Sequence, residues 1–134
     1  EDAATWPEGL TLSLNITPEE LGDPRFAHDF AALIGQSDIA PQRLMLEITE
    51  DLLLRNLAQA ASALKALRGL GFRTALDDFG AGFCNFRYLR ELPLDALKLD
   101  KAMVEGVPAD ATALAVLRAI VALAKALGLA VYAE

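Results

Sequence analysis

Five short apolar segments alternate with stretches of helical pattern, and this alternation constrains the fold more than any other feature of the sequence. We expect strands over residues 10–15, 44–48, 73–77, 96–99 and 129–133. The first of four helical regions begins near Thr17, with a second start at Asp23. The other three cover roughly 56–68, 86–91 and 112–127. Strand–helix repeats with short connections favour parallel strands joined by right-handed crossovers. The sequence therefore predicts an α/β fold built on a parallel sheet.

The two faces of the expected strands differ in polarity. Leu12 and Leu14 share one face of the first strand, and Ser13 and Asn15 share the other. Residues 44–49 alternate in the same way. A doubly wound sheet buries both faces under helices and favours apolar residues on both. One aliphatic face and one polar face instead favour a TIM-type (β/α)8 barrel, whose outer helices cover the aliphatic side.

The length of the chain covers only part of such a barrel. A (β/α)8 barrel usually needs roughly 250 residues, and this chain has 134. With about five strands and four helical regions, residues 1–134 are expected to be the central strands of a barrel truncated at both ends.

Composition excludes several classes of protein. Apolar residues make up 54% of the chain, which is too many for a disordered segment. A net charge of −7 argues against non-specific binding to DNA. The single Cys84 excludes a disulfide scaffold and favours a reducing, cytoplasmic compartment. Arg118 and Lys125 interrupt the most apolar stretch, so we expect no membrane segment.

Polar residues stand at the carboxyl ends of the expected strands: Asn15, Glu47, Asp77, Asp78, Lys98 and Glu134. In a barrel these ends open onto one mouth, so the side chains would converge there. Carboxylates at such short distances repel one another. Mg²⁺ or Mn²⁺ would relieve this repulsion, because these ions take carboxylate and amide oxygens as ligands. Adjacent aspartates can serve two ions about 4 Å apart. The pattern predicts a two-metal hydrolytic site.

Four of these residues also have a structural interpretation, whereas a buried, unpaired Glu47 would be costly and favours function. Asn15 could belong to a turn, Asp77 and Asp78 could cap one, and Lys98 could pair with a neighbour inside the barrel. Asp100 is expected to cap a helix or accept a bond from a backbone amide. The convergence of the whole set on one mouth favours function over these separate interpretations.

Five motifs carry a resemblance to a known family. They are Leu-Ser-Leu-Asn-Ile-Thr at 12–17, Leu-Glu-Ile-Thr-Glu at 46–50, Asp-Asp-Phe-Gly-Ala-Gly at 77–82, Leu-Lys-Leu-Asp at 97–100 and Val-Tyr-Ala-Glu at 131–134. In order and spacing they resemble the EAL domain family of bacterial cyclic di-GMP phosphodiesterases. The Glu-Ala-Leu motif that names the family is not in this chain, and Phe-Cys-Asn-Phe at 83–86 replaces the family's Tyr-Ser-Ser-Leu.

The resemblance implies roles for the polar residues at the ends of the first four expected strands. Asn15, Glu47 and Asp77 would be metal ligands, and Asp78 would hold a second Mg²⁺ or Mn²⁺ and take part in catalysis. Lys98 would contact the water or phosphate at the reacting centre.

Two further glutamates have implied roles. Glu134 would orient that lysine or the metal-bound water. Glu50 would anchor the loop after Asp78, which in the family also supports dimerisation. The implied reaction is hydrolysis of cyclic di-GMP to linear pGpG in second-messenger signalling.

The resemblance also implies partners and leaves alternatives. A homodimer and flanking sensory or diguanylate cyclase domains are common in the family. Because the Glu-Ala-Leu glutamate is a metal ligand there, this chain by itself is expected to be inactive. A degenerate cyclic di-GMP receptor is the main alternative. An enolase-type barrel also places acids and a lysine around Mg²⁺, but the adjacent Asp77 and Asp78 argue against it.

Overall fold

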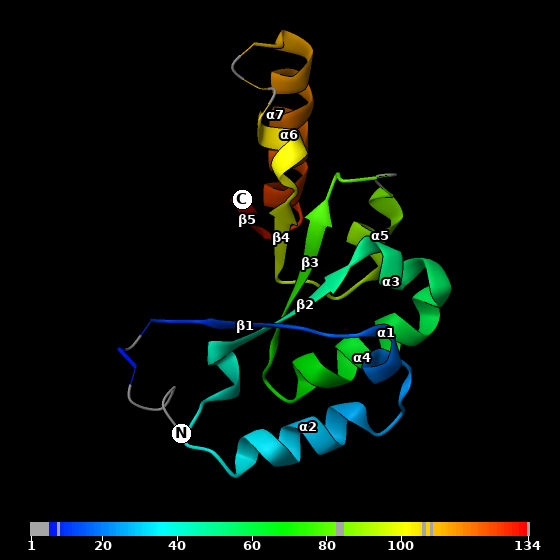
Figure 1. Cartoon of the computed structure of the whole chain (residues 1–134), viewed down its shortest axis with the longest axis vertical. Helices are drawn as coiled ribbons and strands as arrows, with labels where there is room; N and C mark the ends of the chain where they lie inside the picture. Colours follow the sequence, from blue (N-terminus) through cyan, green and yellow to red (C-terminus); the bar gives the residue numbers. More distant parts are fainter. Residues whose placement is uncertain (1–5, 8, 83–84, 106, 108, 134) are drawn as a thin grey trace.

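Five parallel strands, paired in the order β1-β2-β3-β4-β5, form the sheet of the computed structural model (Figure 1). The structure describes residues 6–7, 9–82, 85–105, 107 and 109–133. The strands are β1 (Leu12–Asn15), β2 (Leu44–Thr49), β3 (Arg73–Phe79), β4 (Ala96–Leu99) and β5 (Ala130–Ala133). All five expected strands are confirmed. Each strand pairs with the next one along the chain, as in a (β/α)8 barrel, whereas the strand order of a doubly wound sheet reverses at a switch point.

Along the chain the helices alternate with the strands, and they are more numerous than expected. They are α1 (Pro18–Gly22), α2 (Phe26–Gly35), α3 (Glu50–Arg55), α4 (Leu57–Gly69), α5 (Phe86–Glu91), α6 (Lys101–Glu105) and α7 (Ala111–Ala126), with a 3-10 turn η2 (Pro41–Arg43). The two starts expected in the first helical region correspond to α1 and α2, but α2 begins at Phe26 with Arg25 as its N-cap, and the expected cap at Asp23 was wrong. The helices α3 and α6, of six and five residues, were not expected, because they are too short to show a helical period. The equally short α1 was predictable only from its capping box. None of the described helices is long and apolar enough to cross a membrane.

Local capping explains where several helices begin and end. Thr17 and Glu20 form the expected capping box at the start of α1. The side chain of Asn56 accepts a bond from the Gln59 amide and caps α4, as expected. Gly128, with φ +74°, follows α7 and allows the chain to turn into β5.

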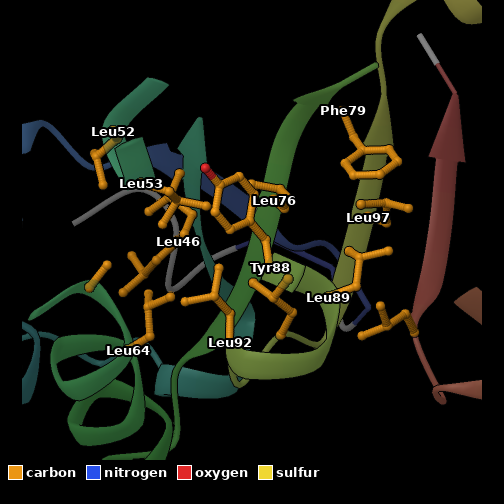
Figure 2. Packing of buried hydrophobic residues seen from close by; sticks show 14 of the residues in the cluster. Leu46, Leu52, Leu53, Leu64, Leu76, Phe79, Tyr88, Leu89, Leu92 and Leu97 are labelled. Carbon is orange, nitrogen blue, oxygen red and sulfur yellow. The ribbon is translucent and has the colours of Figure 1, made fainter. Parts of the chain in front are cut away.

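The helices cover one face of the sheet. The large hydrophobic cluster joins aliphatic residues of β2, β3 and β4 to helical residues such as Leu53, Leu64 and Tyr88. Figure 2 shows these side chains packed together, with Leu64 and Tyr88 reaching toward the strands. A second, small cluster of Met45, Ala75 and Ala96 lies apart from it. The expected difference between an aliphatic face and a face of small and polar residues is therefore confirmed.

A bulge near the end of β3 redirects its side chains. Leu76 pairs with Leu97, and Phe79 pairs with Leu99, so Asp77 and Asp78 lie opposite the single Lys98. Without the extra residue, Phe79 would point to the opposite face from Leu76. With it, both side chains join the large cluster and the two aspartates stay together at the strand end.

At the amino end of β4, Asp95 ties several elements together. Its carboxylate accepts bonds from the Thr74 amide (2.8 Å) and the Thr74 hydroxyl (3.2 Å). It also accepts a bond from the Arg68 guanidinium at 2.9 Å. The Asp95 carbonyl accepts a bond from the Ala130 amide at the start of β5. This one residue therefore helps to align three strands and the end of α4.

Candidate active site

Three charged side chains from successive strands meet at the carboxyl end of the sheet. The Lys98 ammonium on β4 donates a bond to Oε2 of Glu47 on β2 at 3.1 Å. The same ammonium lies 3.7 Å from Oδ1 of Asp77 on β3. The structure thus brings together three of the residues that the sequence places in one site.

Small residues make room for this arrangement. Glu47 and Lys98 are separated by the whole width of β3, where Ala75 is the register partner of both Glu47 and Ala96. Partners in parallel strands point to the same face, so Glu47, Ala75 and Ala96 share it. Because Ala75 and Ala96 extend only a methyl group from this face, the long side chains can meet across β3. These alanines were not predicted from the sequence, where their only signal was their place two positions before Asp77 and Lys98.

The site is partly withdrawn from water. The Glu47 side chain is 4% exposed, that of Asp77 is 14% exposed and that of Lys98 is 20% exposed. Burial raises the pKa of the Asp77 carboxyl, and the nearby carboxylates of Asp78 and Glu47 add to the rise. The Asp78 amide and the Lys98 ammonium oppose it by lowering the pKa, without cancelling it. Ionised Asp77 is therefore held in a site that disfavours its charge.

Asp78 and Asn15 border this cluster without entering its ion pairs. Asp78 is exposed and takes a left-handed backbone conformation with φ +55°, which aspartate tolerates better than most residues. Its amide donates a bond to Oδ1 of Asp77 at 3.0 Å. Asn15 is exposed at the end of β1, where it is the register partner of Glu47.

Glu50 lies beside a cavity next to the aspartates. The cavity has a volume of about 330 Å³ and is lined by Thr49, Glu50, Asp51, Asp78, Ala81, Gly82 and Tyr88. One carboxylate oxygen of Glu50, Oε1, is buried and has no hydrogen-bond partner in the described part of the chain. Burial raises the pKa of Glu50, and the neighbouring Asp51 adds to the rise. Glu50 is thus close to the segment after Asp78 that it was expected to anchor.

We predict that Glu50→Gln increases the free energy of unfolding at pH 7. A carboxyl with a raised pKa in the folded state destabilises the fold above that pKa, where it must ionise in a poor environment. The gain should shrink as the pH falls through the raised pKa toward the ordinary value of 4.5. Urea unfolding of the wild type and of Glu50→Gln between pH 7 and pH 4 measures this gain in stability. Glu19→Gln, at an exposed position in α1, is the control, and lower stability of Glu50→Gln at pH 7 would contradict the prediction.

The donor atoms fit a hard divalent cation. Oε1 of Glu47 is buried and has no hydrogen-bond partner among the described residues, so it offers an open acceptor beside Asp77. Carboxylate and amide oxygens are the ligands that Mg²⁺ and Mn²⁺ prefer. Within the described ranges, however, no three Asp, Glu, His or Cys side chains form a group that could hold a metal. Lys98 occupies the space between two of the acids. Glu134 and Cys84 lie outside the described residues.

Asp100 was expected to cap a helix or accept a bond from a backbone amide. Asp100 accepts a bond from the Ala102 amide at 2.8 Å, and its own amide donates to the Phe79 carbonyl at 3.0 Å. Its expected role in capping is confirmed. The bulge at Asp77 was not foreseen, although the spacing of three between Leu76 and Phe79 was a signal for it.

Comparisons with known proteins agree with this geometry. The chain is 38% identical over 127 residues to the cyclic di-GMP phosphodiesterase NbdA of Pseudomonas aeruginosa, covering 95% of this chain and 16% of that protein. It superimposes on the crystal structure of the EAL domain of Mycobacterium smegmatis DcpA with a TM-score of 0.89 and 30% identity, covering 99% of this chain and 59% of that one. The chain therefore spans only part of the length of the relatives that it matches.

A third similar protein has been solved with metal and nucleotide. Klebsiella pneumoniae BlrP1, in a manganese and cyclic di-GMP complex, matches with a TM-score of 0.89 and 28% identity, covering 98% of this chain and 34% of that one. A calcium and cyclic di-GMP complex of the same protein matches equally well.

The family model described as "EAL domain" matches residues 1–134, the whole of the sequence. The parallel sheet, the strand-end acids and the solved relatives all agree with that match. This chain belongs to the EAL domain family.

Proposed function

We propose that this chain contributes the central part of a metal-dependent phosphodiesterase site that hydrolyses cyclic di-GMP to linear pGpG in bacterial second-messenger signalling. The observation that carries the proposal is the meeting of Glu47, Asp77 and Lys98 from three successive strands, at 3.1 Å and 3.7 Å from the ammonium. Relatives named as cyclic di-GMP phosphodiesterases support the substrate.

The metal-binding role falls to acids and an amide at the strand ends. Asn15, Glu47 and Asp77 would hold one Mg²⁺ or Mn²⁺, and Asp78 would hold a second. Two such ions lower the pKa of a water and neutralise charge that develops on the phosphoryl oxygens. Asp77 and Asp78 suit this role because the bulge keeps both at the end of β3.

Other residues would act on the substrate and on the loop. The Lys98 ammonium would donate a hydrogen bond to a phosphoryl oxygen and offset its negative charge. Glu134 would orient that ammonium. Glu50 would hold the segment after Asp78, and its place beside the same cavity as Asp78 supports this role.

We further propose that residues 1–134 are one part of a larger barrel in a cytoplasmic enzyme. The 59% coverage of the M. smegmatis EAL domain supports this. Additional strands would complete the site, so the chain by itself would be inactive. The complete enzyme would act as a homodimer and carry sensory or diguanylate cyclase domains.

An assay of the natural protein that contains this chain tests the proposal. The protein is incubated with cyclic di-GMP and either Mg²⁺ or Mn²⁺, and pGpG is measured by chromatography. Asp77→Asn should lower the rate by about a thousandfold, which is typical for the loss of one electrostatic contact to the reacting centre. Asp38→Asn, at an exposed position, should leave the rate unchanged.

Two outcomes would contradict the proposal that the protein is a phosphodiesterase. Tight binding of cyclic di-GMP without pGpG would make the protein a receptor. If the protein neither binds nor hydrolyses cyclic di-GMP, this nucleotide is not its ligand.

A further inference from the structure

We propose that Lys98 is an internal counter-cation: in the metal-free protein its ammonium holds the carboxylates of Glu47 and Asp77, and a divalent cation competes with it for these two acids. The inference rests on the proposed function and deepens it. It makes Lys98 a competitor of the metal before it becomes a contact of the substrate.

The contacts give the first argument. The Lys98 ammonium lies 3.1 Å from Oε2 of Glu47 and 3.7 Å from Oδ1 of Asp77. A Mg²⁺ ion binds a carboxylate oxygen at about 2.1 Å. If such an ion bound Oε2 of Glu47 while the lysine stayed in place, it would lie at most about 5 Å from the ammonium. The lysine and the cation would share the same two carboxylates.

Charge gives the second argument. In a partly buried site, the repulsion between a double and a single positive charge about 5 Å apart is roughly ten times the thermal energy. Glu47 is 4% exposed, so water screens this repulsion poorly. The two carboxylates offset part of this repulsion, so the two cations compete for their charge, and the lysine is the one on a flexible stem.

The shape of the site gives the third argument. The methyl groups of Ala75 and Ala96 leave room on this face for the Lys98 side chain to reach back to Glu47 across β3. Lys98 is also next to the last residue of β4, and its 20% exposed side chain can turn toward the open end of the sheet. There its ammonium could donate to a phosphoryl oxygen. Metal binding would thus release the group that the substrate needs.

A purely structural lysine predicts the opposite result on mutation. If Lys98 only held Glu47 in position for the metal, its removal would weaken metal binding. If Lys98 competes with the metal, removal of its charge strengthens metal binding and weakens the metal-free fold.

Calorimetric titration with MnCl₂ separates the two cases. The natural protein that contains this chain is compared with Lys98→Met, which keeps the length of the stem without the charge. We expect Lys98→Met to bind Mn²⁺ about tenfold more tightly, or more. Its melting temperature without metal should be lower, and its increase on adding Mn²⁺ should be larger. Lys101→Met, whose lysine is exposed and paired with Glu105 at 2.9 Å, should match the wild type. Glu47→Gln should lose most of the binding.

A measurement on the unmutated protein keeps the inference testable if Lys98→Met does not fold. Acetylation of lysines by acetic anhydride is followed by mass spectrometry with and without Mg²⁺. Reaction at Lys98 should rise several-fold when Mg²⁺ is present, because the ammonium leaves its carboxylates. Reaction at the exposed Lys65 and Lys125 should not change.

The outcomes also separate this inference from the proposed function. If the wild type binds Mn²⁺ and Lys98→Met binds it equally or less tightly, the inference is overturned and the phosphodiesterase proposal stands. Acetylation of Lys98 that stays constant or falls with Mg²⁺ overturns it as well. If neither protein binds Mn²⁺, the inference and the metal-dependent mechanism are overturned together.

Discussion

Gly80→Ala should lower the free energy of unfolding by about 3 kcal/mol. Gly80 has φ +98°, a conformation that L-residues adopt only with strain. A β-carbon at this position would also overlap Sδ and Cγ of Met103 on α6. The residue directly follows the bulged end of β3, so the overlap would have to be relieved by movement of the Met103 side chain or of the backbone next to Asp78. Urea unfolding measures the loss.

A double-mutant cycle separates the two causes. In a Met103→Ala background, Gly80→Ala should cost only the backbone strain, about 1 kcal/mol. Gly35→Ala is the matched control, because a β-carbon at Gly35 would meet nothing within 4 Å and its φ is ordinary. An equal cost of Gly80→Ala with and without Met103 would show that the contact with α6 plays no part.

Asp95→Ala should lower the free energy of unfolding by about 2–4 kcal/mol. Thr74 is fully buried, and its amide donates to Asp95 at 2.8 Å. The substitution would leave this amide buried without an acceptor, which is more costly than the loss of an exposed bond. It would also break the ion pair with Arg68, whose side chain is 42% exposed and whose contribution is therefore small.

Two variants test this explanation. Asp95→Asn keeps an oxygen for the Thr74 amide and should cost less than Asp95→Ala. Asp38→Ala, at an exposed position, should change stability by less than about 0.5 kcal/mol. Equal losses in Asp95→Ala and Asp95→Asn would assign the effect to the charge of Asp95 and not to the amide of Thr74.

The strands were predictable because their hydrophobic pattern is local. All five strand predictions lie within two residues of the observed ends, and the expected β4, 96–99, agrees fully. The helix α7 was also predictable, since it spans 16 residues and shows its period clearly. The helices α3 and α6 were not, because a helix of one or two turns has no clear periodicity; the equally short α1 was predictable from its capping box.

The residues of the candidate site were predictable from their place at strand ends. Parallel strands bring their carboxyl ends to one edge, so Glu47, Asp77 and Lys98 had to lie near one another in any such sheet. Their contacts were not predictable. Which carboxylate oxygen bonds the ammonium depends on the register of three strands and on the methyl groups of Ala75 and Ala96 between them.

The sequence by itself determined that this protein is an α/β chain of parallel strands with acids and a lysine at the carboxyl ends. Alternation of polarity and the residues at strand ends are properties of short segments, which the chain carries wherever it folds. Only the tertiary structure decided the bulge that turns Phe79 into the core and places both Asp77 and Asp78 opposite Lys98. It also decided that Lys98 reaches Glu47 across β3, because both features depend on how separate strands are aligned when the hydrophobic core packs.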